Sequence, residues 1–468
     1  MLMPYILIYL TLILICVRCF CSYGSGEERD ARFHAEVEAE ENVYSYHSSD
    51  NGADPLWSYG SSCIARIGEK AFISGVKTLP DATPLNNVQW QLFERADNGW
   101  KLLAAAPGRT REPCPLACFQ DGTLFLSDNP TLNPNQRSGP ARPEILVFPA
   151  TDPTAPPERL LPVWDGQPPF TEHSYRSFAA DGKNRELILF QNIGYTHAEW
   201  SFRDSQGKWS ARGQLKWPWG AEYPEPEPIR ICYPTVALRD RAVYFCGVSD
   251  IIEPYPQWRA YKKEVSGRDW DYDFRRLFFA RSDDITSGKF HDWVEVSSRD
   301  KTCGWIFPND LWVGPDRVVH LLWTERALDE RLRQKFFPNE KQSSALMYAR
   351  ARDGKVELKR PIQILEEGKV GEVPGNGRFQ VTADGRLFVL YYVSGTGDGG
   401  RPVSEDRLIE ILRDGTQSKA VPVPLKRAFT RFFTATWRAG SPLSNVIDIY
   451  GSQTGSEGAM SYARIRIR

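Results

Sequence analysis

The chain has 468 residues, which is more than one ordinary domain of roughly 100–150 residues needs. Hydrophobic residues make up 41% of it, and 58 basic side chains nearly balance 59 acidic ones. This composition excludes a long disordered protein, and the net charge of −1 lacks the basic excess typical of nucleic-acid binding. We therefore expect two or three domains or one large repetitive fold, with no nucleic-acid partner.

Residues 1–23 have the pattern of a signal peptide. Residues 1–17 are nearly all apolar, and Arg18 and a small polar run follow them. The apolar stretch of about 13 residues fits the hydrophobic region of a signal peptide and is short for a bilayer span. We predict a secreted protein, periplasmic or extracellular, with no stable membrane span after signal removal. An uncleaved anchor is the alternative, because no positive charge precedes the apolar stretch.

Residues 24–41 are acidic, and we predict a flexible, solvated lead-in there. Six cysteines follow, an even number that permits disulfides in an exported protein. Most lie near predicted strand starts, which favours a packing role. Cys232 and Cys246 flank one predicted hairpin, so a disulfide between them, or a zinc site with a nearby histidine, is the alternative. The six are Cys63, Cys114, Cys118, Cys232, Cys246 and Cys303.

One unit recurs along residues 42–468: an apolar strand, a tight turn, a second apolar strand and then a more polar hairpin. Two hairpins make four strands, so we predict an all-β fold, a seven-bladed β-propeller of four-stranded antiparallel blades. Two β-sandwiches are the alternative. Residues 325–336 have helical periodicity, and we interpret them as a loop insertion. The seven predicted turn centres are Gly68, Gly122, Gly182, Asp240, Asp316, Gly385 and Gly440.

Propeller geometry selects candidate site residues. The residues just before each innermost strand, and just after each second strand, converge on one face around the axis. Two of the six histidines, His173 and His197, fall at this face on a single blade. We therefore predict that the functional site lies on this face. Further candidates at these positions are Arg176, Tyr195, Arg230, Tyr233, Trp305, Asn376 and Arg378.

Two turns resemble eroded Asp-boxes, whose family form is Ser-x-Asp-x-Gly-x-x-Trp, of the sialidase-like propellers. They are Asp-Asn-Gly-Trp at 97–100 and Asp-Ser-Gln-Gly-Lys-Trp at 204–209, both without the leading serine. The resemblance covers the chain from about Asn42 to its end and implies a seven-bladed propeller of this group.

Within that group, the series His173, His197, Tyr233 and Arg259 resembles the propeller-type polysaccharide lyases, the ulvan lyases and their relatives. Those enzymes pair two histidines from one blade with a tyrosine from the next and an arginine soon after it. The resemblance implies a lyase that cleaves a uronic-acid-containing polysaccharide by β-elimination. No matching metal cluster accompanies the series, and Arg230 or Arg176 is an alternative to Arg259.

These residue types suit that chemistry. Elimination removes the C5 proton of the uronic acid while a cation, best a bidentate arginine, neutralises the C6 carboxylate. Neutral histidine or tyrosine can act as base, and a phenol can protonate the leaving O4. We expect His173 or His197 as base or substrate clamp, Tyr233 as acid or base and Arg259 as neutraliser. The substrate-binding candidates are Tyr195, Arg176, Arg230, Trp305, Asn376 and Arg378.

The expected partner is an acidic polysaccharide or oligosaccharide, bound by a monomer. The chemistry requires no cofactor, and a structural zinc or calcium ion is compatible with it. A glycoside hydrolase is the first alternative, because two carboxyl groups about 5–10 Å apart would suffice. A propeller that only binds glycan or protein is the second. The carboxylates that could serve a hydrolase are Asp128, Asp250, Glu253 and Glu325, and a sialidase-like arginine triad could come from Arg176, Arg230, Arg378 and Arg431.

Overall fold

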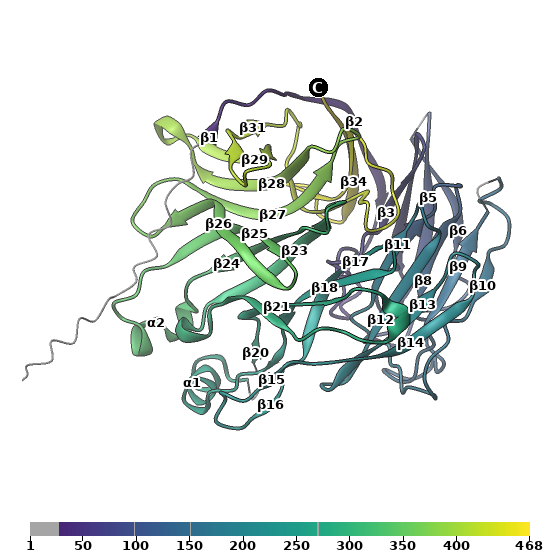
Figure 1. Ribbon diagram of the computed structural model, residues 1–468, viewed down its shortest axis with the longest axis horizontal. Coiled ribbons are helices and arrows are strands. Elements are labelled where there is room, and N and C mark those ends of the chain that lie inside the picture. Colours follow the sequence, from purple (N-terminus) through teal and green to yellow (C-terminus); the bar gives the residue numbers. More distant parts are fainter. Residues whose placement is uncertain (1–27, 98, 150, 269–270) are drawn as a thin grey trace, which may run out of the picture.

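The computed structural model describes residues 28–97, 99–149, 151–268 and 271–468. The predicted signal peptide, and Asn98 of the first Asp-box-like turn, lie outside these residues. Seven antiparallel sheets, each with four strands as its body, surround one axis (Figure 1). The predicted seven-bladed β-propeller is therefore confirmed. In the part of the chain that the structure describes, none of the helices has the length and apolar character that crossing a bilayer requires.

The first three blades follow one another without interruption. Blade 1 contains β3 (Ile64–Ile67), β4 (Lys70–Thr78), β5 (Val88–Ala96) and β6 (Gly99–Ala105). Blade 2 contains β7 (Leu116–Cys118), β8 (Leu124–Asp128), β9 (Glu144–Phe148) and β10 (Glu158–Leu160). Blade 3 contains β11 (Ser177–Asp181), β12 (Glu186–Ile193), β13 (His197–Arg203) and β14 (Trp209–Lys216).

Blades 4 and 5 carry the longer insertions. Blade 4 contains β17 (Ile231–Arg239), β18 (Ala242–Ser249), β21 (Arg276–Ser282) and β22 (Val294–Ser298). Blade 5 contains β23 (Trp305–Val313), β24 (Val319–Arg326), β25 (Ser343–Arg352) and β26 (Lys355–Glu366). Two short ribbons lie outside the blades, β15 (Trp219–Gly220) with β16 (Glu227–Pro228) and β19 (Ile251–Ile252) with β20 (Tyr272–Asp273).

Blades 6 and 7 include strands from the N-terminal region. Blade 6 contains β27 (Glu372–Val381), β28 (Leu387–Thr396), β29 (Pro402–Ile411) and β30 (Gln417–Ser418), with β31 (Val421–Pro422) and the parallel β1 (Glu28–Arg29) at its edge. Blade 7 contains β32 (Phe429–Thr434), β33 (Val446–Gln453), β34 (Ala459–Ile467) and β2 (Ala35–Ser45).

Every predicted turn centre connects the first and second strands of a blade. Gly68 and Gly385 have left-handed backbones, with φ of 58° and 83°, which a side chain would strain. Asp240 adopts a similar conformation at φ 48°, which aspartate tolerates better than most residues. Turn chemistry alone therefore located the inner hairpin of each blade.

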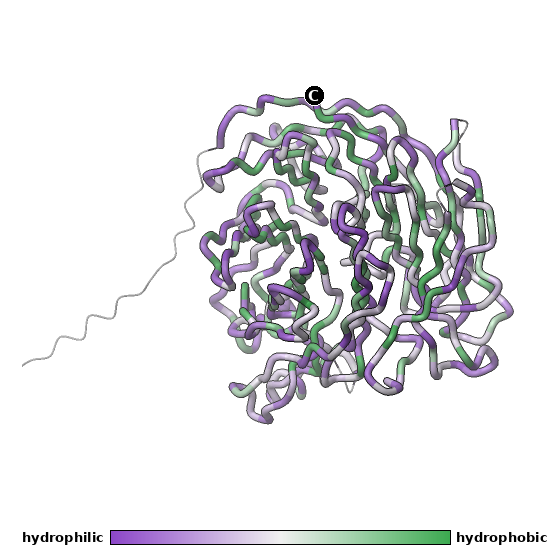
Figure 2. Tube along the Cα trace, turned by 45° about the vertical axis from the view of Figure 1, so that its right-hand side comes forward, coloured by the Kyte–Doolittle hydropathy of each residue, from purple (hydrophilic) through white to green (hydrophobic). Residues whose placement is uncertain are grey.

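The apolar core lies between neighbouring blades. Trp312 and Leu322 of blade 5, for example, pack with Phe379 and Val389 of blade 6, and all four side chains are buried. Figure 2 shows hydrophobic stretches along the interior strands and hydrophilic stretches in the connecting loops. Such packing follows from short strands that are apolar on both faces and are covered by a sheet on each side.

The N-terminal segment closes the ring, and the predicted flexible lead-in is wrong from Glu28 onward. β2 pairs antiparallel with β34 as the outermost strand of blade 7 (Figure 1). Its sequence alternates small or apolar residues with glutamates: Ala35 is buried, whereas Glu36 and Glu38 are exposed. A period of two is typical of a half-buried strand, so here the acidic composition concealed a strand pattern.

Two segments fill the axis of the propeller. The connection between β32 and β33 inserts Arg438 and Ala439, whose carbonyls accept hydrogen bonds from the backbone of blades 3 and 2. Segment 56–61 enters before blade 1, and there Ser61 Oγ accepts a hydrogen bond from the Phe178 amide at 3.0 Å. The central channel is therefore filled by these two segments, and we look for a ligand site on the faces of the propeller.

Helix α1 (Pro256–Ser266) follows β19, and α2 (Glu330–Phe336) follows β24. Both lie on the face where second strands end, and the rings of Tyr261 and Phe336 join them at 5.6 Å. The predicted insertion at 325–336 is helical only in its second half, because β24 continues to Arg326.

Helix α1 was not predicted. Its sequence signals are a proline at the first helical position, Pro256, and the left-handed Gly267 after its last residue. Three single 3₁₀ turns complete the described secondary structure, at Ile285–Ser287, Asp300–Thr302 and Asp398–Gly400.

All six described cysteines are buried free thiols, which agrees with the packing role. The alternative disulfide between Cys232 and Cys246 is not formed. Cys246 lies opposite Thr235 across the β17–β18 pair, whereas Cys232 lies opposite Val248, because a bulge separates the two registers.

Candidate functional site

Aromatic rings gather where the innermost strands begin, on the face selected from the sequence. Tyr233, at the start of β17, lies at their centre, with its ring 5.1 Å from Tyr175, 5.0 Å from Tyr59 and 5.1 Å from Phe307. Trp57 stacks on Tyr175 at 5.1 Å. These five rings, here called the aromatic cluster, come from segment 56–61 and from blades 3, 4 and 5.

Three tyrosines of this cluster have unusual backbones. Tyr59, Tyr175 and Tyr233 have φ of 31°, 43° and 48°, in the left-handed region that bulky residues rarely adopt. Tyr233 also lies in the bulge between Cys232 and Thr235, which releases it from the β17–β18 ladder. Strain of this kind is kept where a side chain must point in a direction that a regular strand does not allow.

His173 packs against the cluster. Its ring lies edge-on to Trp57 at 5.4 Å and to Tyr175 at 4.6 Å, and its side chain is half-buried. Burial, followed by the positive charges of Arg111 and Arg230, lowers the pKa of His173 to about 3. The imidazole is therefore neutral at physiological pH and available to accept a proton.

Arg230 is the cation of this site. Its Nη2 lies 2.6 Å from Asp250 Oδ2, and its Nε donates to the Asp250 carbonyl at 3.0 Å. The guanidinium also lies 4.0 Å from the ring centroid of Tyr195, which is 43% exposed. Burial opposes the charge of Arg230, but Asp250, together with Tyr175, Cys232 and Tyr195, raises its pKa above the usual value, so the guanidinium stays charged. Carboxylate and ring hold it in one orientation.

Tyr233 has the opposite acid–base character to His173. Burial is the largest cause of a raised Tyr233 pKa, and the nearby Cys232 and Asp250 add to it. The phenol therefore stays protonated at physiological pH and can donate a proton. A neutral imidazole and a protonated phenol thus share two ring neighbours, Trp57 and Tyr175.

Two predicted catalytic residues lie apart from this site. His197 begins β13, where Thr196 Oγ1 lies 2.7 Å from one ring nitrogen and Glu199 Oε1 lies 3.0 Å from the other. Arg259 is exposed on α1. Among the described residues, no hydrogen bond, ion pair or ring contact joins either of them to the aromatic cluster.

Three predicted substrate-binding residues donate hydrogen bonds to backbone carbonyls of the propeller. Arg378 is buried and donates to the carbonyls of Asn309, Phe432 and Tyr59. Asn376 donates to the Phe432 carbonyl at 3.2 Å and lines a cleft. Arg176 is buried and donates to the Pro113 carbonyl at 2.8 Å.

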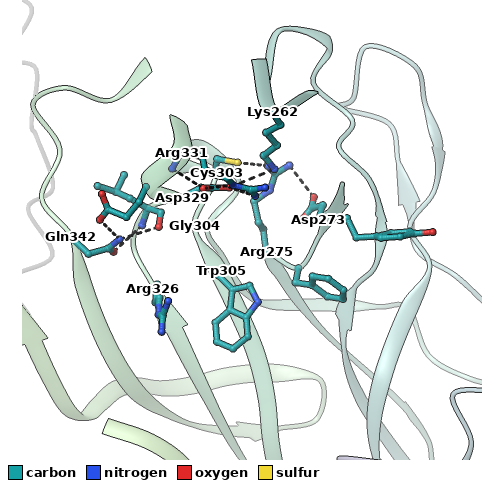
Figure 3. A pocket seen from close by; sticks show the side chains of 14 residues that line it. Lys262, Asp273, Arg275, Cys303, Gly304, Trp305, Arg326, Asp329, Arg331 and Gln342 are labelled. Atoms are coloured by element: carbon teal, nitrogen blue, oxygen red, sulfur yellow. Dashed lines mark hydrogen bonds and ion pairs between the residues drawn. The ribbon is translucent and has the colours of Figure 1, made fainter. Parts of the chain in front are cut away.

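Trp305 stands between two clefts on this face. One, of about 290 Å³, is lined by Tyr59, Phe307, Asn376 and Arg431 among others. The second, of about 380 Å³, lies beneath α1 and α2 and contains a buried ion network (Figure 3). There Lys262 Nζ lies 2.7 Å from Glu253 Oε2, and Arg275 bonds the same carboxylate. Lys262 Nζ also lies 3.7 Å from Asp329 Oδ2, so the network joins the two insertions.

The described residues include no set of side chains that could bind a metal ion. In residues 28–97, 99–149, 151–268 and 271–468, no group of three or more histidine, cysteine, aspartate or glutamate side chains is placed to hold an ion. At Cys232 and Cys246 a zinc ion would therefore lack further protein ligands.

Sequence reasoning placed Tyr175 on this face beside His173 without assigning it a role, and it did not identify Trp57, Tyr59 or Phe307. Trp57 and Tyr59 lie in the segment that leads into β3, but several residues separate them from its first residue, Ile64, so the rule that strand starts converge does not mark them. Phe307 lies two residues inside β23, so no positional signal marks it.

No protein-family model matches this chain, and no curated protein sequence matches it either. Solved structures do match. The polysaccharide lyase Uly1 is 13% identical with a TM-score of 0.50, over 92% of this chain and 93% of that one. An α-L-arabinanase from Penicillium chrysogenum is 9% identical with a TM-score of 0.40, over 92% and 98% of the two chains. A protein of unknown function from Dyadobacter fermentans is 11% identical with a TM-score of 0.42, over 93% and 99%.

At such identities the likeness to Uly1 shows a shared fold. The protein is a seven-bladed β-propeller, a fold that it shares with the polysaccharide lyase Uly1.

Proposed function

We propose that this protein is a polysaccharide lyase that cleaves a uronic-acid-containing polysaccharide by β-elimination at the aromatic cluster. The observation that carries the proposal is the meeting of His173 and Tyr233 around Trp57 and Tyr175, with Arg230 held by Asp250 at the same site. At physiological pH His173 is neutral and Tyr233 is protonated, and these are the protonation states in which one group can accept a proton and the other can donate one.

In the proposed step, a ring nitrogen of His173 takes the C5 proton of the uronic acid. The electron pair left at C5 forms the C4–C5 double bond as the bond from C4 to O4 breaks. The Tyr233 hydroxyl gives its proton to the departing O4, so the two products are an unsaturated sugar and a new chain end. Arg230, held by Asp250, stabilises the charge that develops on the C6 carboxylate.

Arg230 replaces Arg259 in this role. The charge of Arg230 already acts on His173, and its guanidinium is oriented by a carboxylate and a ring. Arg259 is an exposed helix residue without such support. For the same reason the proposal assigns the role of base to His173. His197 instead pairs with Glu199 away from the aromatic cluster.

A hydrolase is less well supported. The four carboxylates considered for it, Asp128, Asp250, Glu253 and Glu325, are all buried. Each also has internal partners: Asp128 accepts from Trp90, and Glu325 accepts from Trp323 and Arg299. A glycosidase needs two carboxyl groups open to the substrate, one of them free to protonate the leaving oxygen.

The setting of the enzyme is part of the proposal. A signal peptide at 1–23 would export the chain as a monomer to the medium or periplasm, where acidic polysaccharides of surfaces and matrices are found. The side chains named above supply the whole reaction, so the proposal includes no metal or organic cofactor.

The test follows absorbance of the new double bond while purified protein acts on a panel of uronic-acid polysaccharides. With an active substrate, His173→Ala, Tyr233→Phe and Arg230→Lys should each lower turnover by roughly 10²–10⁴-fold. The matched controls His197→Ala and Arg259→Lys should stay within a few-fold of wild type. If the controls are as damaging as the site variants, or if products form without the double bond, the proposal is wrong.

A further inference from the structure

We propose that Trp305 and Arg326 form a subsite for a second anionic sugar unit of the same polysaccharide chain. The inference rests on the proposed function for the identity of the ligand, and on separate residues for its binding. Trp305 and Arg326 are directly opposite partners in the pairing of β23 with β24. Opposite residues of an antiparallel pair project from the same side of the sheet, so indole and guanidinium are neighbours.

Both side chains are open to ligand. Trp305 is 38% exposed and Arg326 is exposed. Figure 3 shows both extending away from the buried ion network. Both also line the 290 Å³ cleft and the 380 Å³ cleft, so they form the wall that the two share. A ligand in either cleft meets an aromatic face and a positive charge together.

The pair is connected to the proposed catalytic site. Trp305 stacks on Phe307 at 5.4 Å with 16° between the ring planes. Phe307 lies 5.1 Å from Tyr233, the proposed acid. A chain whose leaving unit sits at Tyr233 therefore passes over Phe307 to reach Trp305, and its next units meet Arg326.

Charge defines the ligand as anionic. The other cleft arginines are neutralised by carboxylates: Arg331 by Asp329, at 2.6 Å, and Arg431 by Asp54, at 2.7 Å. Among the residues that the structure describes, Arg326 has no carboxylate within ion-pair distance. An exposed indole alone would suit a neutral sugar, but an uncompensated guanidinium beside it favours a carboxylate or sulfate group.

Binding can be measured without turnover. Full-length protein is titrated, by calorimetry and by tryptophan fluorescence, with tetragalacturonate, a sulfated chondroitin tetrasaccharide and the neutral cellotetraose. Arg326→Gln should weaken binding of an anionic tetrasaccharide about tenfold or more, and Arg326→Lys should restore part of it. Arg259→Gln, which removes another exposed arginine of this face, is the matched control and should change nothing. In the absorbance assay Arg326→Gln should raise KM with kcat nearly unchanged.

The two proposals fail separately. Arg326-dependent binding of an anionic tetrasaccharide without any unsaturated product supports the subsite and contradicts the lyase. Product formation with the same KM in Arg326→Gln as in wild type overturns the subsite and leaves the lyase. The subsite is also overturned if neither anionic tetrasaccharide binds, or if cellotetraose binds as tightly as they do. The response to the carboxylated or the sulfated probe identifies the group that Arg326 binds.

Discussion

Arg438 Nη2 donates to Asp310 Oδ1 at 2.6 Å in the centre of the propeller, where both side chains are almost completely buried. Arg438 comes from the β32–β33 connection of blade 7, whereas Asp310 belongs to β23 of blade 5. The same guanidinium donates to the carbonyls of Gly60 and Val236, in segment 56–61 and blade 4. One side chain therefore ties together three blades and the segment that carries Trp57 and Tyr59.

This relationship predicts a large effect on stability. Asp310→Asn leaves the Arg438 charge buried without its counter-charge, which should lower the free energy of unfolding by about 3–5 kcal/mol. The exposed ion pair between Lys419 and Asp30 is the control, and Asp30→Asn should leave the free energy of unfolding nearly unchanged. Chemical denaturation measures both. Equal effects of the two substitutions would contradict the central role of the Asp310 pair.

A second prediction concerns ring closure by β2. A chain that begins at Glu28 keeps β2 and should fold with a sharp thermal transition. A chain that begins at His47 loses β2, which exposes the edge of β34 and removes ion pairs such as Arg95 with Glu41, at 2.7 Å. We expect a much lower melting temperature and a tendency to associate, seen by calorimetry and gel filtration. Similar melting of the two truncated chains would show that β2 is dispensable.

The pH dependence of the reaction gives a third prediction. The pKa of His173 is lowered to about 3, so the base stays neutral down to that region, and the raised Tyr233 pKa keeps the acid protonated above pH 10. We therefore expect kcat/KM to stay level across pH 6.5, where an ordinary histidine would titrate. Arg111→Gln removes one of the charges that lower the His173 pKa. The fall of kcat/KM on the acidic side of the pH profile should therefore move to higher pH. A wild-type limb at pH 6.5 would contradict this assignment of the base.

A fourth prediction concerns stability in acid. Burial lowers the pKa of His320 to about 4, and its Nδ1 lies 2.7 Å from the Tyr348 hydroxyl. Between pH 6.5 and 4 the unfolded chain binds a proton at His320 that the folded chain does not, so stability falls as pH falls through this window. His320→Gln should remove about 2–3 kcal/mol of this loss.

The His320 comparison is made by urea denaturation at pH 4.5 and at pH 8. At pH 8 neither state is protonated at His320, so the difference between wild type and variant reports the substitution alone. If that difference is the same at both pH values, His320 does not contribute to the acid sensitivity.

Much of the fold could be predicted because its signals are local. A turn residue such as Gly385, flanked by two short apolar strands, specifies a hairpin wherever it occurs, and seven such hairpins specify the propeller. The same geometry selected the face on which His173, Arg230 and Tyr233 meet. It could not distinguish His173 from His197, because both lie near the ends of blade 3 strands and only packing placed one of them beside Trp57.

By itself, then, the sequence determined the blade count and the inner hairpins, since turn chemistry and strand periodicity act over a few residues. Only the tertiary structure decided which distant residues become neighbours. Glu38 bonds Arg466 across 428 residues, and Arg438 reaches Asp310 across 128. Such pairs form only after all seven blades have closed around the axis, because no local pattern specifies which side chain will fill the centre or which strand will complete the last sheet.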